Sequence, residues 1–368
     1  MTGCRACGHP DLDPALDLGR VPLPGRFPVR ETPVRSDEVR SRLAMLLCRA
    51  CGLAQLGCDA GPDTHRTAVA PEYRNVDHAV RIIRKAGLLS GGTISEFGSP
   101  KGERWLPRLQ PFGFRSPRHG EPASVVVDSF ALERELDQRR ALRERAAALT
   151  PDGTLLLEFR SLSAVIAQRR WDALQYGRFV YYTVTTLRRA LEDAGLLLWN
   201  AWPIGPTADV ILAAAVCEGT LYPEPFVRRR LAAEREEGIT TVRTVRVLQA
   251  AADRDAAALH SWLRQMALRH RTVTAYGATA STVTLFARAH VSRTLVSAVA
   301  DGTPGHHGRR MPGTDVPIVA PDLMVSAAPD HILVTAPREL AELRSRYPEL
   351  GDRWTLPPRG TDELRRDR

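Results

Sequence analysis

Two Cys-x-x-Cys pairs near the start of the chain constrain its fold more than any other feature. They are Cys4-Arg5-Ala6-Cys7 and Cys48-Arg49-Ala50-Cys51, and a glycine follows each pair. Four thiolates at about 2.3 Å complete a closed tetrahedral shell around zinc. The trailing glycine allows the tight turn that points backbone N–H groups at sulfur. In a cytoplasmic chain such pairs favour a metal over disulfides. We therefore predict a zinc-binding module over residues 1–60, with a structural zinc ion on Cys4, Cys7, Cys48 and Cys51.

Length and charge narrow the class of protein. With 368 residues and 43% hydrophobic content, the chain can form two or three cores. It has no run of about 18 apolar residues and no apolar segment after its first residues, so we expect a cytoplasmic location and no membrane partner. The net charge of +9 could serve nucleic acid. However, the arginines that dominate the basic residues are scattered and not interleaved with aromatic residues, which disfavours that partner.

Strands and helices are predicted to alternate after the first 70 residues. The predicted strands are 93–97, 124–128, 154–159, 196–202 and 208–216, and the predicted helices are 72–90, 132–149 and 185–195. The continuous apolar runs at 124–128 and 154–159 are typical of buried parallel strands. A helical stretch at 224–269 is followed by predicted strands at 273–278, 295–299, 316–319 and 331–334, and a helix at 338–346. The pattern predicts an α/β protein with two doubly wound units.

The order of these parts resembles the SAM-dependent sugar C-methyltransferases, which methylate dTDP-linked deoxysugars in antibiotic pathways. The matching segments are 48–56, Glu-Phe-Gly-Ser-Pro-Lys-Gly at 96–102, Tyr-Gly-Ala-Thr-Ala at 276–280, and 309–318. The resemblance spans roughly residues 4–357. It implies a Rossmann-like methyltransferase domain over 72–220 and a Rossmann-like substrate domain over 221–357. The polar residues 358–368 are expected to form a disordered tail.

The resemblance implies that S-adenosylmethionine (SAM) binds at the glycine loop after the first strand of the methyltransferase domain. Glu96 would face its amino group or ribose, the loop would let the backbone approach the ligand, and an acid after the second strand would hold the ribose hydroxyls. The residues expected to bind SAM are Glu96, Gly98, Ser99, Gly102 and Glu121.

This loop departs from the family in two ways. Pro100-Lys101 stands where the family usually has Asn-Asp, which replaces an acid by a base beside the expected sulfonium. In addition, only residues 103–123 separate the loop from the next buried strand. Related enzymes have about three helices and two strands in this place. We therefore predict a shortened methyltransferase domain that lacks one helix and one strand of the donor site.

The catalytic segment of the family, Tyr-His-Glu-His, is replaced here by Gln175-Tyr176-Gly177-Arg178. Carbon methylation beside a ketone needs a base and a group that stabilises the enolate. By position, Tyr176 and Arg178 are the candidate catalytic residues, although an arginine cannot act as a base. The alternative is that the tyrosines of this segment are packing residues.

In the family, the C-terminal half helps to hold a nucleotide-sugar between domains. The residues expected to bind this substrate are Tyr181, Tyr276, Arg309 and Arg310. The two arginines suit a pyrophosphate, or they are simply solvated. His306-His307 could bind a metal, serve as a base or lie exposed.

Two functional hypotheses follow. The first is a divergent SAM-dependent C-methyltransferase that acts on a nucleotide-activated, dTDP-type deoxysugar or a related metabolite in secondary-metabolite biosynthesis. The second is a non-methylating relative that has lost SAM and either catalyses another reaction or serves as a scaffold for a pathway enzyme partner. A zinc-knuckle nucleic-acid binder is disfavoured because no basic–aromatic patch is present.

Overall fold

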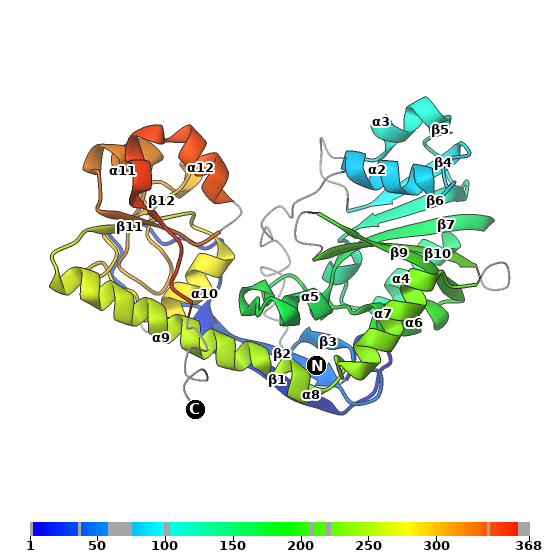
Figure 1. Ribbon diagram of the computed structural model, residues 1–368, viewed down its shortest axis with the longest axis horizontal. Coiled ribbons are helices and arrows are strands. Elements are labelled where there is room, and N and C mark those ends of the chain that lie inside the picture. Colours follow the sequence, from blue (N-terminus) through cyan, green and yellow to red (C-terminus); the bar gives the residue numbers. More distant parts are fainter. Residues whose placement is uncertain are drawn as a thin grey trace.

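The computed structural model describes residues 3–35, 38–57, 76–98, 104–205, 209–217, 222–336 and 339–359. These residues form three sheets of four, six and five strands. Figure 1 shows the five-stranded sheet on the left, the six-stranded sheet on the right, and strands β1 to β3 below and between them. The α/β fold class predicted from the sequence is confirmed.

The four-stranded sheet is antiparallel, in the order β1-β2-β3-β8. Its strands are β1 (Leu12–Pro22), β2 (Arg40–Cys48), β3 (Ala54–Leu56) and β8 (Val180–Tyr181). The last strand comes from the segment that carries the candidate catalytic residues, and its Tyr181 pairs with Ala54. The sheet that carries the second cysteine pair is therefore completed by residues outside 1–60.

The six-stranded sheet has the order β5-β4-β6-β7-β10-β9. Its strands are β4 (Gly92–Phe97), β5 (Phe114–Arg115), β6 (Ala123–Ser129), β7 (Leu149–Arg160), β9 (Leu196–Ile204) and β10 (Val210–Cys217). The first four strands in that order are parallel, and β10 is antiparallel to both of its neighbours. Between β4 and β6, the described residues contain only the two-residue strand β5, the helix α3 (Leu106–Leu109) and the short turn η1 (Gln110–Phe112). The described part of the segment between β4 and β6 thus contains fewer elements than related enzymes are expected to have, in agreement with the predicted shortening.

One boundary in this unit differs from the sequence prediction. The predicted helix 132–149 is divided into the short turn η2 (Leu132–Arg134) and the helix α4 (Gln138–Ala147). Asp137 is extended and its side chain accepts a hydrogen bond from Arg140 N, so it caps a new helix start. The predicted stop at 151–153 lies inside β7, where a register shift against β6 accommodates the extra residues.

The five-stranded sheet is parallel throughout, in the order β13-β12-β11-β14-β15. Its strands are β11 (Val273–Tyr276), β12 (Val299–Ala300), β13 (Ile318–Val319), β14 (His331–Val334) and β15 (Trp354–Thr355). The chain order reverses between β11 and β14, which makes this the switch point of a doubly wound sheet. The predicted strand 295–299 was too long, because Leu295 and Val296 close a turn onto Ser292 O.

Helices surround and connect the sheets. α7 (Pro225–Glu236), α8 (Val242–Val245) and α9 (Val247–Leu268) confirm the helical prediction for 224–269. The others are α2 (Val76–Lys85), α5 (Leu162–Ala167), α6 (Val184–Glu192), α10 (Ala280–Arg288), α11 (Pro321–Ala327) and α12 (Leu340–Arg346), with short turns η3 (Trp171–Ala173), η4 (Pro304–His306) and η6 (Pro348–Arg353). Within the described ranges, no helix is both long and apolar enough to cross a bilayer.

One hydrophobic core joins the four-stranded sheet, the segment 162–181 and the C-terminal unit. It contains residues from β1 and β2, from the segment 162–181, and from α9 and the five-stranded sheet. A separate core lies between α4, α6 and one face of the six-stranded sheet and also includes Cys4 and Cys48. The cysteine cluster is therefore packed against the six-stranded sheet.

Candidate functional site

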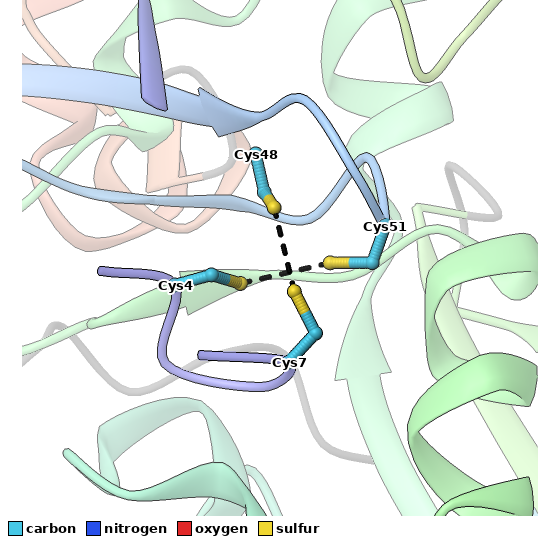
Figure 2. Close-up of side chains that lie close together, drawn as sticks. All are labelled: Cys4, Cys7, Cys48 and Cys51. Carbon is cyan, nitrogen blue, oxygen red and sulfur yellow. Dashed lines mark hydrogen bonds between the residues drawn. The ribbon is translucent and has the colours of Figure 1, made fainter. Parts of the chain in front are cut away.

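The four predicted metal ligands lie together. Their sulfur atoms are all within 4.8 Å of one another. The Sγ atoms of Cys4 and Cys51 are 3.6 Å apart, and those of Cys7 and Cys48 are 3.5 Å apart. Figure 2 shows the four side chains pointing at one common centre. Sulfur atoms at 2.3 Å from a tetrahedral metal would be about 3.8 Å apart, whereas a disulfide would bring two of them to about 2.05 Å. The geometry therefore fits a metal site and not a disulfide.

The backbone turns around the cysteines support this arrangement. Gly8 and Gly52 both have left-handed φ angles, 77° and 73°, and each donates its N–H to the first cysteine carbonyl of its pair. The hydrogen bond with Cys51 lowers the pKa of the Cys4 thiol to about 5. The thiolate is the form of cysteine that binds a metal, and a lowered pKa favours it.

The candidate catalytic residues are buried in the interior. Tyr176 is 2% exposed, and its hydroxyl donates to Ser41 O over 2.7 Å. Arg178 is 3% exposed, and its Nε lies 3.0 Å from Oε2 of Glu133. Tyr181, one of the expected substrate residues, is 1% exposed and accepts from Gln175 N. Among the described residues, all three side chains are thus buried.

Glu133 organises the region around Arg178. It lies in η2, at the carboxyl end of β6, where its Oε1 also accepts from Arg160 N at the end of β7. Its backbone carbonyl accepts from Phe179 N. Arg160 is in turn paired with the buried Asp209. Two buried ion pairs, Arg178 with Glu133 and Arg160 with Asp209, thus lie beyond the carboxyl ends of β6 and β7.

At the donor loop, Glu96 supports the local backbone. One carboxylate oxygen accepts from Trp105 N over 3.0 Å and the other from Leu106 N over 3.1 Å, at the start of α3. Gly98 has a φ of 74°, and a Cβ there would come within 2.7 Å of the Ala131 side chain. The turns after β4 and β6 therefore approach each other closely. Ser99 and Gly102 lie outside the described residues, as do Pro100 and Lys101.

The second expected acid is also engaged. Both Glu121 oxygens bond to the guanidinium of Arg115, and one of them accepts from Arg118 N. The hydrogen bond with Arg115 lowers the pKa of Glu121 to about 2. In the described part of the chain, both carboxylates expected at the donor site therefore have hydrogen-bond partners within the protein. SAM binding by Glu96, Gly98, Ser99, Gly102 and Glu121 stays a prediction.

A cleft of about 300 Å³ lies at the switch point of the five-stranded sheet. It separates the start of α10 and the end of β14 from the segment 169–172, and Gln175 Nε2 donates to Ser281 Oγ across this boundary over 3.0 Å. Lining residues include Trp171, Asp172, Asp255, Ser281, Leu285, Thr335 and Leu356. None of these residues was predicted from the sequence as a site residue, although Ser281 follows directly after the Tyr-Gly-Ala-Thr-Ala loop.

The remaining expected substrate residues have different environments. Tyr276 is 7% exposed, and burial raises the pKa of its hydroxyl to about 12. Arg310 is 2% exposed and donates to the carbonyls of Thr32, Pro33 and Thr314 and to the Glu38 carboxylate. Arg309 lies at the surface and lines another cleft. The structure therefore does not bring the two arginines to one site.

Family models match both ends of this architecture. Residues 4–64 match the model described as "Putative zinc binding domain", and residues 211–355 match "C-methyltransferase C-terminal domain". The chain is also 25% identical over 403 residues to C-methyltransferase NovU of Streptomyces niveus, across 96% of this chain and 94% of that protein. The chain is thus similar to C-methyltransferases over nearly its whole length. This similarity supports a methyltransferase-like transferase.

Solved structures of other methyltransferases are less similar to this chain than NovU is. Magnesium protoporphyrin IX methyltransferase (ChlM) from Synechocystis PCC 6803, with bound SAH, is 15% identical at a TM-score of 0.30 and covers 39% of this chain and 82% of its own. The Burkholderia thailandensis 1,6-didemethyltoxoflavin-N1-methyltransferase is 13% identical at a TM-score of 0.30 and covers 45% and 96%. Similarity at this level says nothing about the donor or the acceptor.

Proposed function

We propose that this chain is a C-methyltransferase-family transferase whose acceptor is a nucleotide-activated, dTDP-type deoxysugar or a related metabolite. It would act in the cytoplasm, in secondary-metabolite biosynthesis. The observation that carries the proposal is the cleft at the switch point of the five-stranded sheet. In open α/β sheets, ligands bind in the crevice beyond the carboxyl ends of the strands at this point.

The lining of the switch-point cleft suits such a ligand. Asp172, Ser281 and Thr335 supply oxygen atoms that can hydrogen-bond to ribose or sugar hydroxyls, and Leu285 and Leu356 supply apolar surface for a base. The cleft is bordered on one side by the segment before β8 and on the other by the C-terminal unit, so a ligand there would contact both halves of the chain.

Calorimetric titration of the zinc-loaded protein with thymidine, dTDP and a dTDP-deoxysugar tests this proposal. We expect the dTDP-deoxysugar to bind, and the variant Ser281→Tyr, which fills the cleft, to weaken binding at least tenfold. Ser326→Tyr, on the exposed part of α11, is the matched control and should bind normally. Equal binding by Ser281→Tyr and the wild type would contradict the proposal.

A second candidate, a non-methylating relative, is favoured by the engagement of the donor and catalytic side chains with the chain itself. Glu96 caps α3, Glu121 pairs with Arg115, and Arg178 pairs with Glu133. A protein of this kind would keep the acceptor cleft and either catalyse another reaction or hold its ligand for a pathway enzyme.

Titration with SAM and S-adenosylhomocysteine separates the two candidates. Micromolar binding of either ligand would rule out the second candidate. Substitutions in residues 99–103 would then test whether this loop contributes to SAM binding. If neither ligand binds up to millimolar concentration, methyl transfer is excluded, while the switch-point cleft is still tested by the nucleotide titration above.

We also propose that the ion at the four cysteines is zinc. Four thiolates and tetrahedral spacing are the preference of structural zinc sites, and four protein ligands leave no open position for catalysis. Zinc would thus fasten the Cys4–Cys7 loop to the end of β2.

A further inference from the structure

Two arginine side chains reach the cysteine pairs from helices that pack on the six-stranded sheet. Arg139, in the first turn of α4, donates from Nη2 to Cys7 O over 2.7 Å. A Cβ at Gly8 would lie 3.8 Å from its Nη1, so the guanidinium also lies beside the turn. Arg189, in the last turn of α6, donates from Nη1 to Cys51 O, again over 2.7 Å. In each pair, the carbonyl of the second cysteine is thus bound by one arginine.

Close backbone contacts surround these two hydrogen bonds. Gln138 N, at the start of α4, donates to Arg5 O in the first cysteine pair over 3.2 Å. Beside the second pair, a Cβ at Gly52 would come within 2.6 Å of the Thr240 side chain, in the turn before α8. The two arginines therefore lie at a tightly packed boundary between the zinc-binding module and the rest of the chain.

The two helix arginines have no acidic partner in the described part of the chain, and their side chains bond to the cysteine carbonyls instead. The arginines inside the cysteine pairs are engaged elsewhere. Arg49 pairs with Asp13 over 2.6 Å, and the guanidinium of Arg5 lies 4.9 Å from the centroid of the Phe179 ring. The helix arginines thus bring positive charge to the cysteine pairs that no carboxylate of the described residues neutralises.

A zinc ion held by the four thiolates would leave negative charge for these arginines to balance. Each thiolate carries one negative charge and the ion carries two positive charges, so the cluster keeps two negative charges. Groups that donate hydrogen bonds around the ligands of a metal site orient those ligands and tune the affinity for the metal. Two guanidinium groups, one on each cysteine pair, match the cluster in number and in sign.

We propose that Arg139 and Arg189 are the charge partners of the zinc–thiolate cluster, and that this charge pairing fastens the zinc-binding module to α4 and α6. The proposal rests on the proposed zinc ion and adds to it, because that ion by itself joins only the two cysteine pairs to each other. Coupling between two sites is reciprocal. Zinc would therefore strengthen the contact of the module with these helices by as much as the arginines strengthen zinc binding.

The test measures the zinc affinity of the full-length protein by competition with a chelator. We expect Arg139→Met and Arg189→Met, which keep an unbranched apolar side chain but lose the charge, each to weaken zinc binding about tenfold or more, the lower end of the usual range for groups around metal ligands. Arg139→Lys and Arg189→Lys keep the charge and should keep most of the affinity. Arg140→Met, on the same helix but paired with Glu144, is the matched control and should bind zinc as the wild type does.

Salt dependence separates a charge partner from a structural hydrogen bond. Both arginines are exposed, so their interaction with the cluster should be screened. The difference in affinity between the wild type and the two methionine variants should shrink as the salt concentration rises from about 0.1 to 1 M, because the screening length falls from about 10 to about 3 Å. Far-UV circular dichroism of the zinc-loaded variants checks that they are folded.

The outcomes distinguish this proposal from that of the zinc ion itself. Wild-type affinity in both methionine variants would overturn the role of the arginines and leave the zinc ion in place. Lysine variants as weak as the methionine variants, or an equal loss in Arg140→Met, would also overturn it, because the effect would then not follow the charge at these two positions. A wild-type protein that binds no zinc would overturn both proposals.

Discussion

Nε of Arg178 lies 3.0 Å from Oε2 of Glu133, and the two side chains are only 4% and 2% exposed. The pair joins the segment before β8 to the end of β6. A position that the sequence marks as catalytic thus forms a buried ion pair, and its contribution to stability can be measured.

Replacing Arg178 by methionine should lower the free energy of unfolding by about 3–5 kcal/mol, because Glu133 would lose the guanidinium beside Oε2 while its carboxylate stays in the interior. Urea unfolding followed by far-UV circular dichroism measures the change in midpoint. The double variant Arg178→Met with Glu133→Gln should recover part of the loss, since the uncompensated charge is removed. Arg42→Ala, which breaks an exposed pair with Asp17, should cost at most about 1 kcal/mol. If Arg178→Met lowered the free energy of unfolding no more than Arg42→Ala does, this would argue against the buried pair.

Removing one metal ligand should abolish metal binding. We expect about one zinc ion per wild-type chain and almost none in Cys48→Ser, because a tetrahedral structural site needs all four thiolates. Elemental analysis measures the content, and chelation should lower the melting temperature of the wild type but not of Cys48→Ser. Cys217→Ser, outside the cluster, is the control and should keep its zinc.

Glu96→Ala should destabilise the protein even when no SAM is present. The substitution leaves the N–H groups of Trp105 and Leu106 without their acceptor, which costs about 1–2 kcal/mol. Thermal unfolding in ligand-free buffer measures the effect. Glu192→Ala, which removes an exposed pair with Arg188 on α6, is the control and should shift the midpoint much less. An unchanged midpoint in Glu96→Ala would leave Glu96 available for a ligand.

Tyr276 should stay neutral well above pH 10. Burial raises the pKa of its hydroxyl to about 12, so the folded state favours the protonated phenol. The resulting stabilisation is fully present below pH 10 and is lost as the pH rises through about 12. Tyrosinate absorbance of the wild type minus that of Tyr276→Phe should therefore show one group titrating near pH 12. A difference curve centred near pH 10 would contradict the buried environment.

The sequence predicted elements well where a single local signal was strong. The buried strands β6 and β10 and the helical stretch 224–269 follow from continuous apolar runs and helical spacing. The boundary of α4 was missed because the capping by Asp137 depends on one extended residue within an otherwise helical pattern. The length of β7 was missed because a bulge can absorb a Pro-Asp-Gly turn signal.

The sequence by itself determined the four cysteines, the two α/β units and the resemblance to C-methyltransferases, because each rests on local spacing or on motifs along the chain. Only the tertiary structure decided which polar side chains have a partner within the chain. Arg310 bonds to the segment 32–38 and Arg178 to Glu133, while Arg309 and His306 line a cleft. These outcomes depend on partners far away in the sequence. A buried charge is stable only when such a partner neutralises it, and no local pattern reveals which distant residue the fold will place beside it.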